Sequence, residues 1–124
     1  MYPPDLKYTR EHEWVRVSGD TADVGVTDYA QQQLGDVVYI ELPKPGQQVR
    51  AGAVFGTIES VKAVSDLFAP VTGEVTAVNE DLVSRPEAVN SAPHDTWMIR
   101  IRLTSPEEVG ALLDHAGYAS LVAS

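Results

Sequence analysis

The chain has 124 residues, of which 44% are hydrophobic and 22% charged, a composition typical of one compact globular domain. Asp and Glu number 18 against 9 Lys and Arg, which gives a net charge of −9. This charge opposes attraction to nucleic acids and anionic lipids, so neither is expected as a partner. The absence of Cys excludes disulfides, thiolate catalysis and Cys-ligated metal sites.

The first residues have neither the basic flank and apolar segment of a secretory signal nor the Arg and Ser bias of a transit peptide. This start predicts a cytoplasmic protein. No apolar run approaches the roughly 18 residues that a membrane span needs. We predict a single domain over residues 1–124, with a core at about 8–104 and a C-terminal helical segment at about 105–122.

Short runs rich in β-branched residues follow one another between Trp14 and Leu103, separated by Gly, Pro, Asn and Asp. This spacing is typical of antiparallel β structure rather than of alternating strands and helices. Pro presets the backbone and Gly permits left-handed turns, so loops are predicted at Ser18–Asp20, Pro43–Gly46 and Pro70–Gly73. We predict a mainly β fold with strands at Trp14–Val17, Thr21–Val26, Val37–Glu41, Val54–Ser60, Ala63–Ala69, Gly73–Val78 and Trp97–Leu103.

One short helix is predicted between the second and third of these strands. Asp28 followed three residues later by Gln31 has the spacing of a capping box, and Gly35 stands where a C-terminal cap is expected. The helix should therefore cover Tyr29–Leu34.

The C-terminal region also has helix signals. Ser105 is a candidate N-cap, Pro106 suits the first helical position, and Glu108 suits the third. We predict a helix from Pro106 to about Asp114. A further turn at Tyr118–Val122 should cover the edge of the sheet, where an exposed strand would promote aggregation.

Enzyme signatures are absent. The chain has no Gly-x-Ser-x-Gly or Ser-x-x-Lys pattern, and its Gly-rich stretches do not form a phosphate-binding loop. His12 between Glu11 and Glu13 raises the possibility of a metal site. Neighbours along a strand face opposite sides, however, and no second His lies within ligand spacing, so a surface cluster is the favoured interpretation.

The segment Gly56–Pro70 consists of two strand-like arms that meet near Lys62, which predicts a β-hairpin without Gly or Asn at its tip. Lys62 is the only cationic residue between Arg50 and Arg85, and acidic residues surround it in the sequence. The pattern therefore presents a lone amine in an acidic setting.

The direct neighbours of this amine are Val61 and Ala63, which offer little competing chemistry. An amine on a rigid mount suits covalent modification. Two alternatives remain open from the residues alone. From the spacing alone, a solvated turn lysine is the favoured interpretation of Lys62. A Schiff-base lysine fits less well, because it needs burial or a cationic neighbour.

Five stretches of the chain resemble the H-protein family of the glycine cleavage system, whose members carry a lipoyl group. The similarity extends from about Tyr8 to Val122. Biotin carriers are less similar because they have Met on both sides of the acceptor lysine, and lipoyl domains of 2-oxo acid dehydrogenases usually have Asp-Lys-Ala where this chain has Val-Lys-Ala. The matching stretches are Tyr8–Val15, Gly25–Gln31, Leu34–Val38, Glu41–Pro43 and Glu59–Asp66.

The resemblance implies an antiparallel β-sandwich of the lipoyl/biotinyl-carrier type with short helices, including one at the C-terminal end. It implies that Lys62 forms an amide with lipoate. Because Glu59 lies on the same hairpin, three residues before the acceptor, we predict that it helps the lipoylating enzyme to orient the amine. The same resemblance implies that the loaded arm docks near Glu13, Asp66 and Leu34.

The resemblance further implies a carrier that catalyses no step itself. A glycine decarboxylase (P-protein) loads the aminomethyl group of glycine onto the lipoyl arm, an aminomethyltransferase (T-protein) unloads it, and a dihydrolipoamide dehydrogenase (L-protein) reoxidises the arm. Two alternatives stand beside this function. One is an H-like lipoyl carrier that relays lipoate to 2-oxo acid dehydrogenases, and the other is a structural interaction domain with an unmodified lysine.

Overall fold

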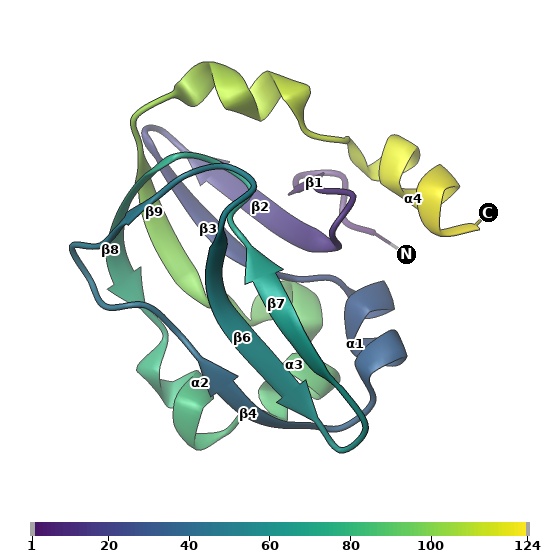
Figure 1. Ribbon diagram of the computed structural model, residues 1–124. Coiled ribbons are helices and arrows are strands. Elements are labelled where there is room, and N and C mark those ends of the chain that lie inside the picture. Colours follow the sequence, from purple (N-terminus) through teal and green to yellow (C-terminus); the bar gives the residue numbers. More distant parts are fainter. Residues whose placement is uncertain (1, 124) are drawn as a thin grey trace.

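The computed structural model describes residues 2–123 as two antiparallel β-sheets packed against each other (Figure 1). The larger sheet has the strand order β1-β2-β3-β9-β8-β5, and the smaller has the order β4-β6-β7. The predicted mainly β, antiparallel architecture is confirmed. The strands are β1 (Lys7–Tyr8), β2 (Glu13–Ser18), β3 (Thr21–Val26), β4 (Val37–Glu41), β5 (Gln48–Val49), β6 (Val54–Ser60), β7 (Val64–Phe68), β8 (Gly73–Val78) and β9 (Ile99–Leu103).

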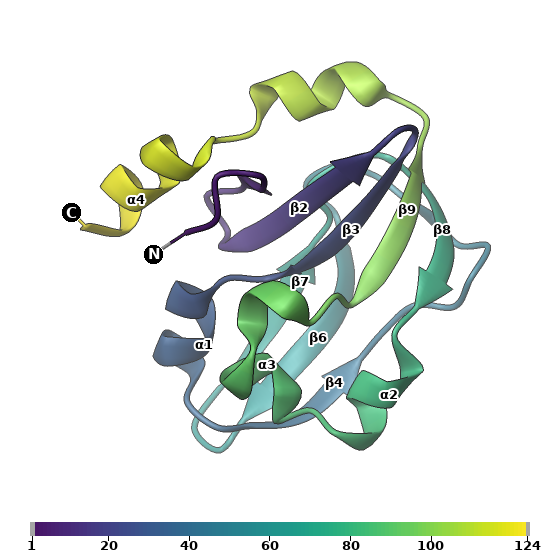
Figure 2. The same cartoon turned by 180° about the vertical axis from the view of Figure 1, so that it is seen from behind.

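Short helices lie toward both ends of the sandwich, as Figure 2 shows from behind. Within residues 2–123, no helix is both long enough and apolar enough to cross a membrane. The two-residue strands β1 and β5 and the helices α2, α3 and η1 were not predicted, because each is too short to have a periodic pattern. The helices are α1 (Asp28–Leu34), α2 (Glu80–Ser84), α3 (Ala88–Ser91) and α4 (His115–Ala123), with 3₁₀ helices η1 (Pro93–Asp95) and η2 (Pro106–Ala111).

Helix α1 begins one residue earlier than predicted. Its N-cap is Thr27, whose Oγ1 accepts a hydrogen bond from the backbone N–H of Ala30 at 3.2 Å. Asp28 lies inside the first turn and accepts from the side-chain amide of Gln31 at 2.7 Å, so the predicted Asp28 capping box is wrong. The predicted end is confirmed, because Gly35 adopts φ +79°, a left-handed conformation that glycine adopts without strain.

The segment that starts at Pro106 is a 3₁₀ helix that ends at Ala111, not an α-helix that continues to Asp114. Ser105 makes no side-chain capping bond. The carboxylate of Glu108 instead accepts two hydrogen bonds from Thr72, from its N–H at 2.7 Å and its hydroxyl at 2.9 Å. Glu108 thus fastens the β7–β8 connection rather than the start of its own helix.

The C-terminal region then covers the edge of the larger sheet, as predicted. Leu113 and Tyr8 exchange backbone hydrogen bonds of 2.8 and 2.9 Å beside β1. Helix α4 follows and contains the predicted turn at Tyr118–Val122. The edge strand β1 is therefore paired on its outer side.

Two hydrophobic cores lie on opposite faces of β2. The main core fills the space between the sheets, and the second, on the outer face, consists of the fully buried side chains of Leu6, Tyr8, Trp14 and Tyr118. Trp14 fits because its cross-strand partner is Gly25, where a Cβ would lie 2.5 Å from the indole. The start of β2 is consequently buried on both sides, which fixes its position relative to α4.

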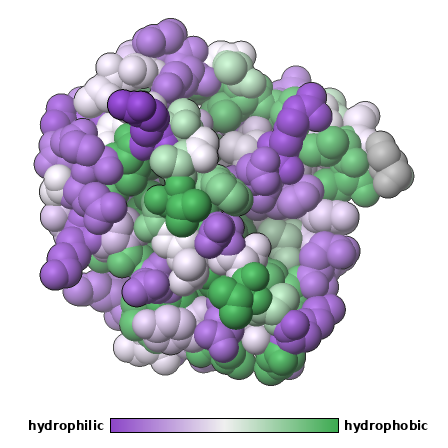
Figure 3. Space-filling model, in the orientation of Figure 1, coloured by the Kyte–Doolittle hydropathy of each residue, from purple (hydrophilic) through white to green (hydrophobic). Residues whose placement is uncertain are grey.

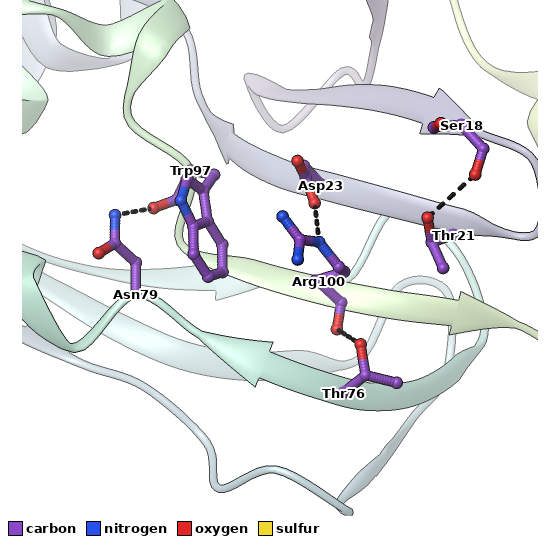
Figure 4. Close-up of polar contacts among 7 residues, drawn as sticks. All are labelled: Ser18, Thr21, Asp23, Thr76, Asn79, Trp97 and Arg100. Carbon is purple, nitrogen blue, oxygen red and sulfur yellow. Dashed lines mark hydrogen bonds and ion pairs between the residues drawn. The ribbon is translucent and has the colours of Figure 1, made fainter.

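Farther along the same outer face the larger sheet is polar (Figure 4). Arg100 donates from Nε to Oδ1 of Asp23 at 2.7 Å, and its guanidinium lies 5.0 Å from the centroid of the Trp97 ring. Thr76 donates to the backbone oxygen of Arg100 at 3.3 Å. These half-exposed, mutually paired groups make this region a solvated surface.

Candidate functional site

The β6–β7 hairpin presents Lys62 at its tip, as predicted. The turn closes through a hydrogen bond from Ser60 N–H to the backbone oxygen of Ala63 at 2.8 Å. The buried Ser60 hydroxyl oxygen also accepts from the N–H groups of Lys62 at 3.3 Å and Ala63 at 3.1 Å. A serine side chain therefore does the structural work that Gly or Asn usually does in a tight turn.

The tip is also attached to the end of α1. Val61 N–H donates to the backbone oxygen of Asp36 at 3.0 Å. A Cβ placed on Gly35 would lie 3.4 Å from Cε of Lys62, so the alkyl chain of the lysine rests against this glycine. These contacts hold the backbone of the tip while the lysine side chain stays exposed.

Asn90 of α3 holds the connection that supports the tip. Its Oδ1 accepts from Val37 N–H at 2.9 Å, and its Nδ2 donates to the backbone oxygen of Gly35 at 2.9 Å and to Oε1 of Gln31 at 3.0 Å. This role of Asn90 is not predictable from the sequence, because no local motif links it to residues more than fifty positions away.

A cleft of about 340 Å³ lies beside the hairpin, between β7, α1 and the start of β2. It contains three of the predicted site residues, Glu13, Asp66 and Leu34. Glu59, in contrast, is exposed near the end of β6 and is not among the lining residues. The lining consists of Glu11, His12, Glu13, Val26, Tyr29, Ala30, Gln33, Leu34, Ile58, Ala63, Val64, Ser65, Asp66 and Leu67.

The surface around the hairpin mixes polar and apolar side chains (Figure 3). Val61 and Val64, on either side of the tip, are each 69% exposed. Ala63 and Val64 also line the cleft, so the tip and the cleft are continuous. An arm attached at Lys62 therefore has a partly apolar recess beside its point of attachment.

Glu13 is a buried acid rather than part of a surface cluster, and in this respect the sequence-based interpretation is wrong. The residue is only 2% exposed. Its Oε1 accepts from the hydroxyl of Thr9 at 2.7 Å, and its Oε2 accepts from the N–H of Phe68 at 3.3 Å. Burial raises the pKa of Glu13 to about 8, so this carboxyl group is protonated in most molecules at pH 7.

His12 has a left-handed backbone, with φ +73°, which is uncommon for a residue other than glycine. Its Nδ1 lies 2.8 Å from the hydroxyl of Tyr118, and its ring centroid lies 4.7 Å from that of Tyr29. Burial lowers the pKa of His12. Over residues 2–123, no three His, Asp or Glu side chains are grouped so as to hold a metal ion, so the surroundings of His12 give no support to a metal site.

Comparison with known proteins decides the family. Residues 6–124 match the family model described as Glycine cleavage H-protein. The chain belongs to the glycine cleavage H-protein family. The glycine cleavage system H protein of Acidobacterium capsulatum is 52% identical over 121 residues, which cover 98% of this chain and 94% of that protein. The protein of the same name from Rubrobacter xylanophilus is 56% identical over 119 residues, which cover 90% of this chain and 94% of the relative.

A solved H-protein structure shows the same fold. The crystal structure of a glycine cleavage system H protein from Mycobacterium marinum superposes with a TM-score of 0.91 at 36% identity, covering 99% of this chain and all of that one. The recognition of the H-protein family from sequence is thereby confirmed. Members of the family are the carrier component of glycine cleavage and not one of its enzymes, so this chain is a carrier.

The buried Glu13 predicts a pH-dependent stability. Ionisation at a pKa of about 8 in the folded chain, against an ordinary value of 4.5, makes the folded state the stronger proton binder. We therefore compare the free energies of unfolding of wild type and Glu13→Gln. The wild-type value relative to that of the variant should be highest below about pH 4.5 and should fall as the pH rises to about 8. Urea denaturation at several pH values measures it. Parallel curves for the two proteins would contradict the burial argument.

Proposed function

We propose that Lys62 holds a lipoyl group in amide linkage, and that this arm performs the chain's work as the carrier component of the glycine cleavage system. The observation that carries the proposal is the pairing of an exposed lysine on a braced hairpin tip with an adjoining cleft lined by carboxyl and apolar groups. When bound, the lipoyl dithiolane accepts the aminomethyl group of glycine and the accompanying electrons.

The geometry of the tip favours Lys62 over the other lysines of the chain. Lys7 lies in the edge strand β1, and Lys44 lies in the connection between β4 and β5. Both are exposed, but neither occupies a hairpin tip. A lipoylating enzyme that recognises an extended hairpin would therefore find one acceptor.

The cleft supports docking of the loaded arm. The side chains of Leu34, Val26 and Ile58 offer apolar contact to the hydrocarbon part, while Glu13 and Asp66 offer carboxyl groups to the aminomethyl amine. A charge-assisted hydrogen bond from an ammonium to a partly desolvated carboxylate contributes about 1.5–3 kcal/mol. Arrival of this cation should also favour loss of the Glu13 proton, because an opposite charge stabilises the ionised carboxyl. The arm without cargo has no ammonium group to interact with these two carboxyl groups, so docking should depend on loading.

The proposed partners follow from this cycle. They are the decarboxylase that loads the arm, the aminomethyltransferase that unloads it, the dihydrolipoamide dehydrogenase that reoxidises it, and the lipoylating enzyme. The family match does not favour the alternative of an H-like carrier that relays lipoate to 2-oxo acid dehydrogenases.

Substitution of Lys62 by Arg tests the attachment site. Arg keeps the charge but cannot form this amide, so Lys62→Arg should fold with an unchanged free energy of unfolding and gain no lipoate. The measurement is the intact mass after expression in a lipoate-supplied host, with Lys44→Arg as the matched control that should still be modified. Peptide mapping that placed lipoate on Lys7 or Lys44 would disprove the proposal.

Glu59 is the proposed recognition residue for the lipoylating enzyme. It precedes the acceptor by three residues, is exposed, and lies outside the cleft. Glu59→Ala should therefore slow lipoylation without changing the later release of cargo. Initial rates of lipoate incorporation measure the effect, with Glu74→Ala, at a partly exposed acid of β8, as a control for lost negative charge. Equal rates in all three proteins would remove this role.

Docking predicts that the cleft acids protect the cargo. In equally lipoylated and aminomethyl-loaded protein, Glu13→Ala and Asp66→Ala should each release formaldehyde and ammonia about tenfold faster than wild type, which corresponds to about 1.4 kcal/mol. Glu41→Ala, an exposed acid on β4 outside the cleft, is the control for the change in net charge. If all four proteins lose cargo at one rate, the carboxyl groups do not shelter it.

A further inference from the structure

The hydroxyl group of Tyr118, on the C-terminal helix, makes hydrogen bonds to two walls of the cleft from outside it. Tyr118 of α4 is fully buried in the outer core. Its hydroxyl oxygen lies 2.8 Å from Nδ1 of His12 and 2.7 Å from Oγ1 of Thr27. His12 lines the cleft directly, and Thr27 is the N-cap of α1, whose residues form another wall. A single side chain outside the cleft thus connects two of its walls.

Thr27, Tyr118 and His12 form a chain of two hydrogen bonds. Both hydroxyl protons have an acceptor among the described contacts only if Thr27 donates to Tyr118 and Tyr118 donates to His12. The two described contacts of Thr27 Oγ1 are Ala30 N–H, which can only donate, and the hydroxyl of Tyr118, so the buried Thr27 proton has an acceptor only when Thr27 donates to Tyr118. Tyr118 then donates to Nδ1 of His12. This arrangement requires Nδ1 to be unprotonated and therefore assigns the proton of a neutral imidazole to Nε2.

A neutral His12 matters for the charge of the cleft. The ionisable groups that line the cleft besides His12 and Tyr29 are the acids Glu11, Glu13 and Asp66. An imidazolium among them would repel an ammonium cargo, whereas the neutral ring leaves the attraction of the acids unopposed. The bond from Tyr118 thus sets the protonation pattern of His12 as well as its position.

The backbone of His12 is held by hydrogen bonds of its own, in addition to the ring contact with Tyr118. Its left-handed conformation is held by hydrogen bonds from its own N–H to Thr9 and from Thr27 N–H to its oxygen, both 3.1 Å long. Such a conformation persists where the surroundings fix it. It reverses the chain just before β2, so that Glu13 follows directly as a buried residue.

We propose that Tyr118 is a positioning residue for cargo retention, holding His12 and the start of α1 in the geometry in which the cleft encloses the loaded arm. The inference rests on the proposed docking of that arm. It makes α4 a functional part of the carrier, although α4 lies far from the hairpin tip (Figure 1). Because the tip is remote, lipoylation of Lys62 should be unaffected by the Tyr118 hydroxyl.

Tyr8 provides a matched control within the same core. It is fully buried and stacks on Tyr118 with ring centroids 4.8 Å apart. Its hydroxyl donates to the backbone oxygen of Pro3 at 2.7 Å, outside the cleft. Tyr118→Phe and Tyr8→Phe each remove one buried hydroxyl that makes hydrogen bonds, but only the first removes a contact to the cleft walls.

The experiment compares release of cargo from aminomethyl-loaded wild type, Tyr118→Phe, Tyr8→Phe and Asp66→Ala at one pH and salt concentration. Tyr118→Phe should release cargo about fivefold faster, the change expected for a lost hydrogen bond of about 1 kcal/mol, while being lipoylated at the wild-type rate. Tyr8→Phe should stay within about twofold of wild type, since the cleft walls keep their contacts. Nitrogen-15 NMR of the His12 ring should show Nδ1 unprotonated in wild type and in Tyr8→Phe, and an altered tautomer balance in Tyr118→Phe.

The outcomes separate this inference from the docking proposal. If Asp66→Ala accelerates release but Tyr118→Phe matches Tyr8→Phe, docking stands and the role of Tyr118 is overturned. If neither Asp66→Ala nor Tyr118→Phe accelerates release, docking is wrong and the inference fails with it. His12→Gly, whose backbone accepts the left-handed conformation, gives a second test. If Tyr118 acts through His12, the double variant should accelerate release by less than the product of the two single fold-changes. A fold-change equal to that product would show that the two residues act independently and would contradict the inference.

Discussion

The buried carboxyl group of Glu13 ties the two sheets together where the cleft begins. It stands at the start of β2 in the larger sheet and accepts a hydrogen bond from Phe68 N–H at the end of β7 in the smaller one. Thr9 satisfies its other oxygen. Burial of an acid without an ion pair is costly, and proteins reduce that cost by keeping the group protonated. A carboxyl in this state is poised to ionise when a cation arrives beside it.

A carrier has two structural requirements, and in this chain the hairpin tip meets one and the cleft meets the other. An attachment point must be exposed and yet fixed, which the Ser60 hydroxyl and the Asp36 contact achieve at the hairpin tip. A reactive cargo needs shelter, which the cleft along β7 and α1 offers. Asn90 supports the first region from α3 and Tyr118 supports the second from α4. The short helices therefore do more than close the ends of the sandwich.

Local patterns predicted much of the fold and the centre of the site. The main strands follow from β-branched runs between turn residues, and the hairpin around Lys62 follows from the same rule. What failed depends on contacts between distant segments. Glu108 bonds Thr72 instead of its own helix start, and Glu13 is buried because the second sheet covers it. Such partners are set by the packing of the sheets, so a window of neighbouring residues does not reveal them.

The central claim is that the loaded arm occupies the cleft. The most direct test compares backbone amide NMR spectra of uniformly lipoylated protein in its oxidised and aminomethyl-loaded forms. We expect loading to shift the signals of cleft residues on both walls, Ala30 and Leu34 on α1 and Asp66 on β7. The signals of Thr21 and Arg102, a cross-strand pair of the larger sheet outside the cleft, should stay unchanged. Shifts confined to Lys62 and its immediate neighbours would contradict this claim.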